Sequence, residues 1–514
     1  SQELVGTPEP DTLTGGFGDD TIYGNGGNDE IDGQAGSDVI YGGEGDDVII
    51  GNFGDDTLYG EAGNDTITDD QGANLIDGGE GNDTLSSRSL SGNHILIGGT
   101  GLDDISGTGE NLYIDGGEGN DSLSVYGYVQ NEGVNNYLNS GEAIILAGGG
   151  NDNIYADNFI NVNSRGGEGN DNLNSYNWYQ WASTIAFYGE EGDDYGYISY
   201  SYNSELSGGS GEDNLNLEYF VSGTISGGEG GDYLYGREGG NISLSGDDGN
   251  DSLYASGNIS SFLDGGEGDD NLELIFSSNS FYNYSQISEA FEQGVDGKLI
   301  NQPVNSIEGG EGNDILNILG DNTNVWGPYD SIIEASGGDG DDTIKMIDNR
   351  AGVIGQDGNQ YGFAQAQIDG GSGQDNISVS GVLNASITTG TGSDTVALTA
   401  QQFRTIEEGD RTIREYIGWS PEYGDEYEER LVHEANAVTV TDFTAGKSGD
   451  IIDYGDLLRN ASTSYDGANP FAGGFLNLEQ SGEDTLIKFD KDGKDGSESE
   501  GITVAILKNV QASS

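Results

Sequence analysis

The sequence predicts an all-β protein, a parallel β-roll or β-helix solenoid that ends in a small C-terminal β cap. Two observations predict this fold. The pattern Gly-Gly-x-Gly-x-Asp-x-aliphatic-x recurs from Gly15 onward, as in Gly42-Gly43-Glu44-Gly45-Asp46-Asp47-Val48-Ile49. The copies are also regularly spaced, so that successive segments repeat one short strand and one tight turn. Repeats of this kind indicate stacked coils that share one core.

Residues 6–97 are predicted to form a two-sided roll. With the first glycine as position 1, each unit is one strand plus one turn, and two units make one coil with turns on opposite edges. The aliphatic residue at position 8 then points inward. The predicted core residues are Ile22, Ile31, Ile40, Ile49, Leu58, Ile67, Ile76 and Leu85.

The position-6 residues of this roll should form two ladders, one along each edge. The first runs through Asp29, Asp47, Asp65 and Asp83. The second runs through Asp20, Asp38 and Asp56 and reaches Asn74, where the carboxylate and the first glycine are both missing. We therefore expect the second ladder to end at Asn74.

Residues 98–273 are predicted to form a one-sided solenoid. Asp103, Asp121 and Asp152 continue the first ladder, and most later steps to Asp270 are one coil long, with a carboxylate turn on one edge and an ordinary turn on the other. Alternating Tyr, Asn and Ser residues, as in Tyr197–Tyr202, suggest strands with one outward face. Two interpretations stay open for that face: rings stacked along the solenoid, or a strip for ligand binding or self-association.

The remaining chain is predicted to hold three further segments. Residues 274–397 continue the solenoid irregularly, with a short helix at Gln286–Gln293. Residues 398–437 form a charged insertion. Residues 438–514 form the cap, with a hairpin made by Thr485–Asp490 and Gly501–Leu507. A cap is needed because a solenoid otherwise exposes an open core and an unpaired strand edge.

Charge indicates how such a chain can fold and what it can bind. The 514 residues include 92 acidic and 16 basic ones, with a net charge of −76 and no cysteine. Carboxylates about 5 Å apart repel by about 1 kcal/mol in water and by several-fold more when partly buried. The ladders therefore need multivalent cations. The charge excludes nucleic acid as a partner and disfavours anionic lipid, and no apolar run is long enough for membrane insertion.

The repeats resemble the RTX (repeats-in-toxin) calcium-binding nonapeptides of secreted proteins of Gram-negative bacteria and cyanobacteria. The resemblance implies a parallel β-roll with Ca²⁺ between the turns of successive coils, and oxygen ligands without a His or Cys cluster independently favour Ca²⁺. Asn74 and the unit at Gly107 depart from the pattern. The implied carboxylate ligands are Asp20, Asp29, Asp38, Asp47, Asp56, Asp65, Asp83, Asp103, Asp121, Asp152, Asp171, Asp194, Asp213, Asp232, Asp251, Asp270, Asp314, Asp342, Asp375 and Asp394. The implied carbonyl ligands come from turn glycines such as Gly16, Gly18, Gly43, Gly45, Gly79, Gly81, Gly228, Gly230, Gly266 and Gly268.

Two C-terminal motifs bear on location and on metal binding. The segment Asp442–Asp453 is similar to one near the end of many type I secretion substrates, which implies export by an uncleaved signal and an extracellular or cell-surface location. Asp490-Lys-Asp-Gly-Lys-Asp-Gly496 resembles a small calcium loop but lacks the downstream bidentate Glu. A solvated charged turn and a separate cation site both stay open for it.

The sequence favours a non-enzymatic role. It contains no His-Glu-x-x-His, Gly-x-Ser-x-Gly or Walker motif. Catalytic chemistry could only be sought in the charged insertion, at Glu407, Glu408, Arg411 and His433.

The leading hypothesis is a secreted, calcium-dependent structural protein that assembles with copies of itself into an S-layer, sheath or surface filament. In this it resembles cyanobacterial surface proteins of the oscillin type. The alternative is an adhesin or a module that binds cell-surface polysaccharide through aromatic residues, namely Tyr176, Trp178, Tyr179 and Trp181.

Overall fold

The computed structural model divides into two compact units, Ser1–Tyr235 and Gly236–Ser514. Each unit is considered by itself. Only the backbone is described at 304, 412–420 and 424–431. The described residues are 1–88, 92–127, 141–177, 182–276, 304–320, 332–348, 365–382, 384–400, 412–420, 424–431, 437–446, 448–462, 465–494 and 501–512.

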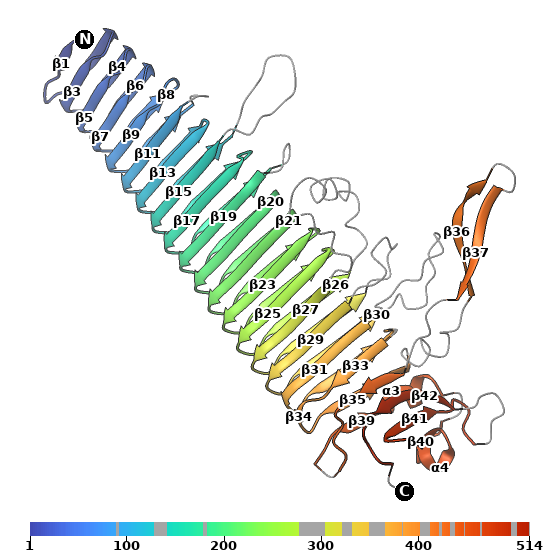
Figure 1. Ribbon diagram of the computed structural model, residues 1–514. Helices are drawn as coiled ribbons and strands as arrows, with labels where there is room; N and C mark the ends of the chain where they lie inside the picture. Colours follow the sequence, from blue (N-terminus) through green and yellow to red (C-terminus); the bar gives the residue numbers. More distant parts are fainter. Residues whose placement is uncertain are drawn as a thin grey trace. The chain divides into compact units, whose positions relative to one another are not determined.

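The first unit is a parallel solenoid in which consecutive strands alternate between two faces (Figure 1). Each strand pairs with the equivalent strand of the next coil, as in Ile22↔Ile40 and Ile40↔Leu58. One face contains β1 (Glu3–Val5), β3 (Thr21–Gly26), β5 (Val39–Glu44), β7 (Thr57–Ala62), β9 (Leu75–Glu80), β11 (Asn93–Thr100), β13 (Asn111–Glu118), β15 (Glu142–Gly149), β17 (Asn161–Glu168) and β19 (Ala182–Glu191). The other contains β2 (Thr12–Phe17), β4 (Glu30–Ala35), β6 (Val48–Phe53), β8 (Thr66–Asp69), β10 (Thr84–Ser87), β12 (Asp104–Thr108), β14 (Ser122–Tyr126), β16 (Asn153–Asp157) and β18 (Asn172–Tyr176).

The last strands of this unit are longer and serve both faces. β20 (Tyr195–Ser210) pairs with β18 through its first half and with β19 through its second half, and β21 (Asn214–Glu229) follows the same course. Each bends at a tyrosine with positive φ, Tyr200 at 62° and Tyr219 at 55°. These bends are the ordinary turns predicted for the one-sided coils. β22 (Tyr233–Arg237) contains the boundary between the units.

The core of the first unit consists of one aliphatic column for each face. All eight predicted position-8 residues, from Ile22 to Leu85, are fully buried. The column works because side chains alternate across a strand, so that every second residue points inward. The prediction of a parallel β-solenoid is confirmed.

The second unit repeats this architecture and adds the cap. One face contains β23 (Asn241–Asp248), β25 (Ser260–Glu267), β27 (Val304–Glu311), β29 (Ile332–Asp339), β31 (Gln365–Gly373) and β33 (Asn384–Thr388), and the short β34 (Thr391–Gly392) pairs with the end of β31. The other contains β24 (Ser252–Ser256), β26 (Asn271–Phe276), β28 (Ile315–Gly320), β30 (Thr343–Asp348), β32 (Asn376–Ser380) and β35 (Thr395–Leu398).

The cap closes the second unit by continuing both faces. β38 (Val438–Val440) pairs with β33, and β39 (Ile451–Asp453) pairs with β35. β42 (Ile502–Leu507) then pairs with β38 and forms an antiparallel sheet with β41 (Asp484–Phe489) and β40 (Leu476–Ser481). The predicted hairpin between β41 and β42 is confirmed. Two short helices, α3 (Gly455–Asn460) and α4 (Pro470–Gly473), complete the cap.

Two sequence predictions fall on other parts of the chain. The charged insertion contains a separate antiparallel pair, β36 (Thr412–Ser420) and β37 (Gly424–Leu431). The expected helix at Gln286–Gln293 lies outside the described residues.

Candidate metal centre

Within each unit the position-6 aspartates form a hydrogen-bonded ladder at the spacing of one coil. One carboxylate oxygen, Oδ1, accepts the backbone N–H of the equivalent aspartate one coil earlier, as from Asp29 to Asp47 and from Asp47 to Asp65, both at 2.7 Å. In the first unit this continues to Asp232, and in the second unit it runs from Asp251 through Asp270, Asp314, Asp342 and Asp375 to Asp394. Each step fixes the rotamer of one aspartate and the position of the next.

The second carboxylate oxygen of these aspartates, Oδ2, is buried and makes no hydrogen bond to the described residues. These side chains are buried, with 1–2 % exposure at Asp47 and Asp103. Their Oδ2 atoms have no hydrogen-bond partner among the described residues, which is costly for a buried charged group without a compensating ligand. This holds at Asp20, Asp29, Asp38, Asp47, Asp56, Asp65, Asp83, Asp103, Asp121, Asp152, Asp171, Asp194, Asp213, Asp270, Asp314, Asp342 and Asp375.

Backbone carbonyls surround the same space. A Cβ placed on Gly15, at position 1, would lie 2.8 Å from Oδ2 of Asp20 and 2.8 Å from the carbonyl oxygen of Gly33 in the next coil. Gly45, at position 4, has a φ of 128°, and a Cβ there would overlap the carbonyl oxygen of Gly27 in the preceding coil. Only glycine permits this approach. The predicted ligand glycines at positions 2 and 4, from Gly16 to Gly268, all have positive φ.

The pKa values of the ladder carboxyl groups show that ionising them in these turns is unfavourable. Burial raises the pKa of Asp65 to about 7, and the charges of Asp83 and Asp47 also raise it, against the N–H that Asp47 donates. Burial likewise raises the pKa of Asp171 and of Asp213 to about 7. At neutral pH the ladder therefore resists full ionisation unless a cation is bound.

The second ladder ends where the sequence predicts. Asp20 donates its N–H to Asp38, Asp38 to Asp56, and Asp56 to Oδ1 of Asn74 at 3.0 Å. The amide Nδ2 of Asn74 donates to the carbonyl of Gln71 at 3.3 Å. Asn74 thus keeps the hydrogen bond of the ladder but has a donor where an aspartate has its second oxygen. Farther along this edge the buried Ser87 and His94 contact each other, with Oγ and Nδ1 3.1 Å apart.

The structure contains a further hydrogen-bonded ladder, at position 5, that was not predicted from the sequence. There the side-chain oxygen accepts the N–H of the following coil, the opposite direction to position 6. Asn28 accepts from Asp46, Asp46 from Asn64, and Asn64 from Asn82. The backbone and side-chain N–H groups of Asn64 lower the pKa of the exposed Asp46, whereas burial raises the pKa of its neighbour Asp47 to about 6. The recurrence of Asn or Asp before the position-6 Asp was the available signal.

The C-terminal end of the position-6 ladder was also not predicted from the sequence. Asp394 donates its N–H to Oδ1 of Asp450, and Oδ2 of Asp450 accepts from Thr389 and Thr444. Asp442 accepts the N–H groups of Thr389 and Gly390. The segment Asp442–Asp453 therefore supplies the residues that close the ladder. Its signal was an aspartate directly before the apolar pair Ile451-Ile452.

Comparison with known families agrees with this geometry. The RTX calcium-binding nonapeptide repeat (4 copies) matches residues 5–40, 24–58, 32–67, 50–85, 137–162, 224–242, 243–258 and 305–322. The chain carries RTX calcium-binding nonapeptide repeats. RTX nonapeptides bind calcium, and proteins that carry them are typically secreted. No curated protein matches the chain.

The RTX turns fit Ca²⁺ in their chemistry. Ca²⁺ takes six to eight oxygen ligands, and both carboxylates and backbone carbonyls serve. Among the described residues no three His, Cys, Asp or Glu side chains converge as a metal cluster. Carbonyls would therefore supply most of each coordination sphere, with the position-6 carboxylate as the charged ligand.

The other sequence hypotheses have more limited outcomes. In the one-sided coils tyrosine rings do neighbour one another, with ring centroids 6.3 Å apart in Tyr155–Tyr176, 5.1 Å in Tyr176–Tyr197 and 4.8 Å in Tyr200–Tyr219. In the Asp490 loop, that carboxylate accepts the N–H groups of Asp492 and Gly493, and the predicted third aspartate, Asp495, lies outside the described residues. So do Trp178, Tyr179, Trp181, Glu407, Glu408, Arg411 and His433. Among the described helices, none is long and apolar enough to cross a membrane.

Proposed function

We propose that this RTX protein is a secreted, calcium-folded structural protein that assembles with copies of itself on the cell exterior. The observation that carries the proposal is the long stack of turns whose buried Oδ2 atoms have no hydrogen-bond partner in the part of the chain that the structure describes. Such a stack is held together by cations, and extracellular calcium modules bind at roughly 10⁻⁴–10⁻³ M. Calcium outside the cell would therefore decide where the protein folds. The proposed role needs no catalytic activity.

An exposed apolar strip supports self-association in the first unit. At the second edge the turn tips carry Phe17, Ala35 and Phe53 in register across three successive coils. Phe17 is 92 % exposed and Phe53 is 59 % exposed. Aromatic residues are enriched at the centres of protein interfaces. A second copy of this chain, brought close by calcium despite the acidic surface, is the proposed occupant.

Export is proposed to follow the type I route. The similarity of Asp442–Asp453 to secretion segments supports it, and so does the charge of −76, because a calcium-free chain of that charge stays extended. Moving the last residues, 438–514, onto a reporter tests this. Export of the reporter by a type I system is expected, and retention of the reporter contradicts the route.

Electron microscopy in millimolar calcium, with and without chelator, tests assembly. Filaments or lattices are expected only with calcium. The double variant Phe17→Ser and Phe53→Ser should stay monomeric while it keeps calcium-induced strand structure by circular dichroism. Tyr59→Ser is the matched control, since it removes an aromatic from the same roll but not from the strip. Strictly monomeric wild-type particles in millimolar calcium would contradict the assembly proposal.

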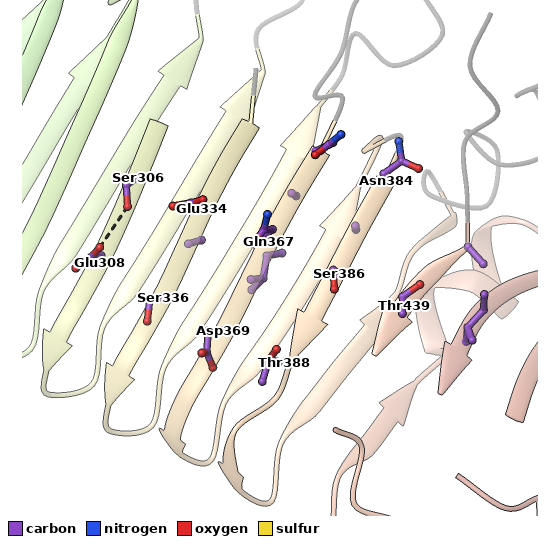
Figure 2. A pocket seen from close by; sticks show the side chains of 17 residues that line it. Ser306, Glu308, Glu334, Ser336, Gln367, Asp369, Asn384, Ser386, Thr388 and Thr439 are labelled. Atoms are coloured by element: carbon purple, nitrogen blue, oxygen red, sulfur yellow. Dashed lines mark hydrogen bonds between the residues drawn. The ribbon is translucent and has the colours of Figure 1, made fainter. Parts of the chain in front are cut away.

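A groove in the second unit favours a second candidate, polysaccharide binding. It has a volume of about 860 Å³ and lies on the outer face of β27, β29, β31, β33 and β38. Figure 2 shows its polar rows, in which Ser306, Glu334, Gln367 and Ser386 occupy equivalent positions of adjacent strands. Hydroxyl, amide and carboxylate groups spaced by one strand could bond successive sugar hydroxyls.

A glycan array with the calcium-loaded protein tests this candidate. Selective binding that is lost in Gln367→Ala and kept in Gln480→Ala, a variant in the cap, supports it. An array without selective binders leaves the structural role as the only proposal.

A further inference from the structure

The second ladder has an unusual residue at its end. Asp69 occupies position 1 of its unit, where Gly15, Gly33, Gly42 and Gly51 stand in the preceding units. The unit remains a stacked turn, because Gly72 at position 4 keeps a φ of 101° and faces the carbonyl of Gly54. The sequence pattern alone shows this as the loss of a glycine.

The structure shows what replaces it. In regular turns the space beside the position-1 Cα holds Oδ2 of the aspartate in the same unit and the position-1 carbonyl of the next coil. At Gly33 these are Asp38 Oδ2, 2.6 Å from an ideal Cβ, and the carbonyl oxygen of Gly51, 3.1 Å from it. At Gly51 the first is Oδ2 of Asp56, at 2.7 Å, and the second is Oδ2 of Asp69. A charged oxygen has taken the place of a neutral carbonyl.

The Oδ2 atoms of Asp56 and Asp69 are both buried and accept no hydrogen bond from a described N–H or hydroxyl group. Asp56 is 1 % exposed and Asp69 is fully buried. Among the described residues no N–H or hydroxyl donor bonds either Oδ2, and the two carboxyl groups lie within hydrogen-bond reach of each other, while Oδ1 of Asp69 accepts the N–H of Gln71 at 3.1 Å. Two buried carboxylate oxygens aimed at one point repel strongly without a cation between them. They are the arrangement expected of a ligand pair.

We propose that Asp56 and Asp69 together hold one divalent cation, with higher affinity than the regular RTX turns, which have a glycine where Asp69 stands. The additional carboxylate strengthens binding, because the number of charged ligands tunes calcium affinity over several orders of magnitude. The site bridges two coils and closes the second ladder before Asn74. The proposal rests on calcium binding by the repeats and is independent of assembly at the cell surface.

Calcium binding to the whole protein, measured by isothermal titration against competing chelators, tests the site. One ion at least tenfold tighter than the others is expected. Asp69→Gly restores the regular turn, so the number of ions should stay the same while the tight one joins the weaker class. Asp56→Asn should remove one ion altogether. The control Asp38→Asn should remove one ion of the weaker class and leave the tight one.

Two results would overturn the proposal. A wild-type protein whose ions form a single affinity class contradicts it directly. A tight class that persists in Asp69→Gly places the tight ion elsewhere. A circular dichroism spectrum of each variant in saturating calcium shows whether it has folded. Should Asp56→Asn fail this check, Asp69→Gly and Asp69→Asn still decide the outcome, since both leave the ladder aspartate in place.

Discussion

The two edges of the first unit start from the same nonapeptide and diverge at a single coil. Along the first edge Asp65 is followed by Asp83 and then by Asp103, each with a buried Oδ2 that has no hydrogen-bond partner among the described residues. Along the second edge Asp56 is followed by Asn74, whose Nδ2 bonds the carbonyl of Gln71. Both edges keep the inter-coil hydrogen bond to the position-6 side chain. The ladder of hydrogen bonds and the ladder of cation sites are therefore separable features.

The comparison also shows how an edge behaves after it loses its carboxylates. Farther along, the second edge turns at residues with positive φ such as Asn158, Tyr200 and Tyr219, while the first edge keeps its glycine turns. Tyr126, Tyr155, Tyr176 and Tyr197 form a row of neighbouring rings on the strands of this region. In this region packed tyrosine side chains stabilise the second edge, whereas cations are proposed to stabilise the first edge.

Calcium removal should have the largest effect. With excess chelator at pH 7.5, the strand signal in circular dichroism should be lost, because unscreened ladder carboxylates repel one another across every coil. Readdition of calcium should restore it cooperatively. A chain that stays fully folded in chelator would falsify the view that cations hold the ladders.

Acidification should partly replace calcium. Folded-state pKa values of about 6 for Asp47 and about 7 for Asp65 lie above the unfolded value of about 3.9. The folded state then binds more protons, so its calcium-free stability is greatest at low pH and is lost as pH rises through about 6–7. In chelator, strand signal should therefore return between pH 8 and pH 5.5, still above the pI of about 4.1.

The calcium-bound protein should show the opposite trend, because calcium needs ionised carboxylates. Its apparent calcium affinity should fall over the same pH interval. Calcium-free strand signal that is equal at pH 5.5 and pH 8 contradicts the assigned pKa shifts.

Asp65→Asn turns one rung of the first edge into the state of Asn74. It should remove one cation and keep the hydrogen bond from Asp47. Loss of a site that is filled to 100 times its Kd lowers the free energy of unfolding by about 2.7 kcal/mol. Urea unfolding at several calcium concentrations measures this, and the deficit should grow with the logarithm of calcium. Asp46→Asn, which removes the same charge at exposed position 5, should change stability by less than about 0.5 kcal/mol.

Gly72→Ala separates the backbone requirement from the requirement for a carboxylate at position 6. Its unit has Asn74 at position 6, yet a Cβ on Gly72 would overlap the carbonyl of Gly54, just as one on Gly63 would overlap that of Gly45. Both substitutions also force alanine into a positive φ, at a combined cost of about 2 kcal/mol or more. Equal losses in urea unfolding are expected. A harmless Gly72→Ala beside a damaging Gly63→Ala would mean that the turn glycine matters only where position 6 is an aspartate.

The repeat made much of this comparison predictable. The period places one aspartate per coil on each edge, and position 8 places Ile49 and Leu58 in the core, because strand alternation and stacking leave no other face for them. The end of the second ladder followed from one residue, Asn74. Such predictions succeed because each depends only on position within a repeated unit.

Other features depend on contacts between coils that the repeat does not encode. In the repeat pattern Asp69 appears only as the loss of a position-1 glycine. The stacking of one coil on the next places its carboxylate beside that of Asp56. Asp450 lies 56 residues beyond Asp394, so the charged insertion hides its place in the ladder. The position-5 ladder was visible as a preference for Asn and Asp, but its direction is set by the three-dimensional turn.

The tyrosine row should give the smallest effect and the clearest contrast with the ladders. Tyr176 lies between Tyr155 and Tyr197, with ring centroids 6.3 and 5.1 Å away. Tyr176→Ser removes both ring contacts, at about 0.5–1.5 kcal/mol each beyond lost burial. Because these contacts involve no cation, the loss in urea unfolding should stay constant across calcium concentrations, unlike that of Asp65→Asn. A deficit that grows with the logarithm of calcium would instead mean that the row acts by supporting the cation edge.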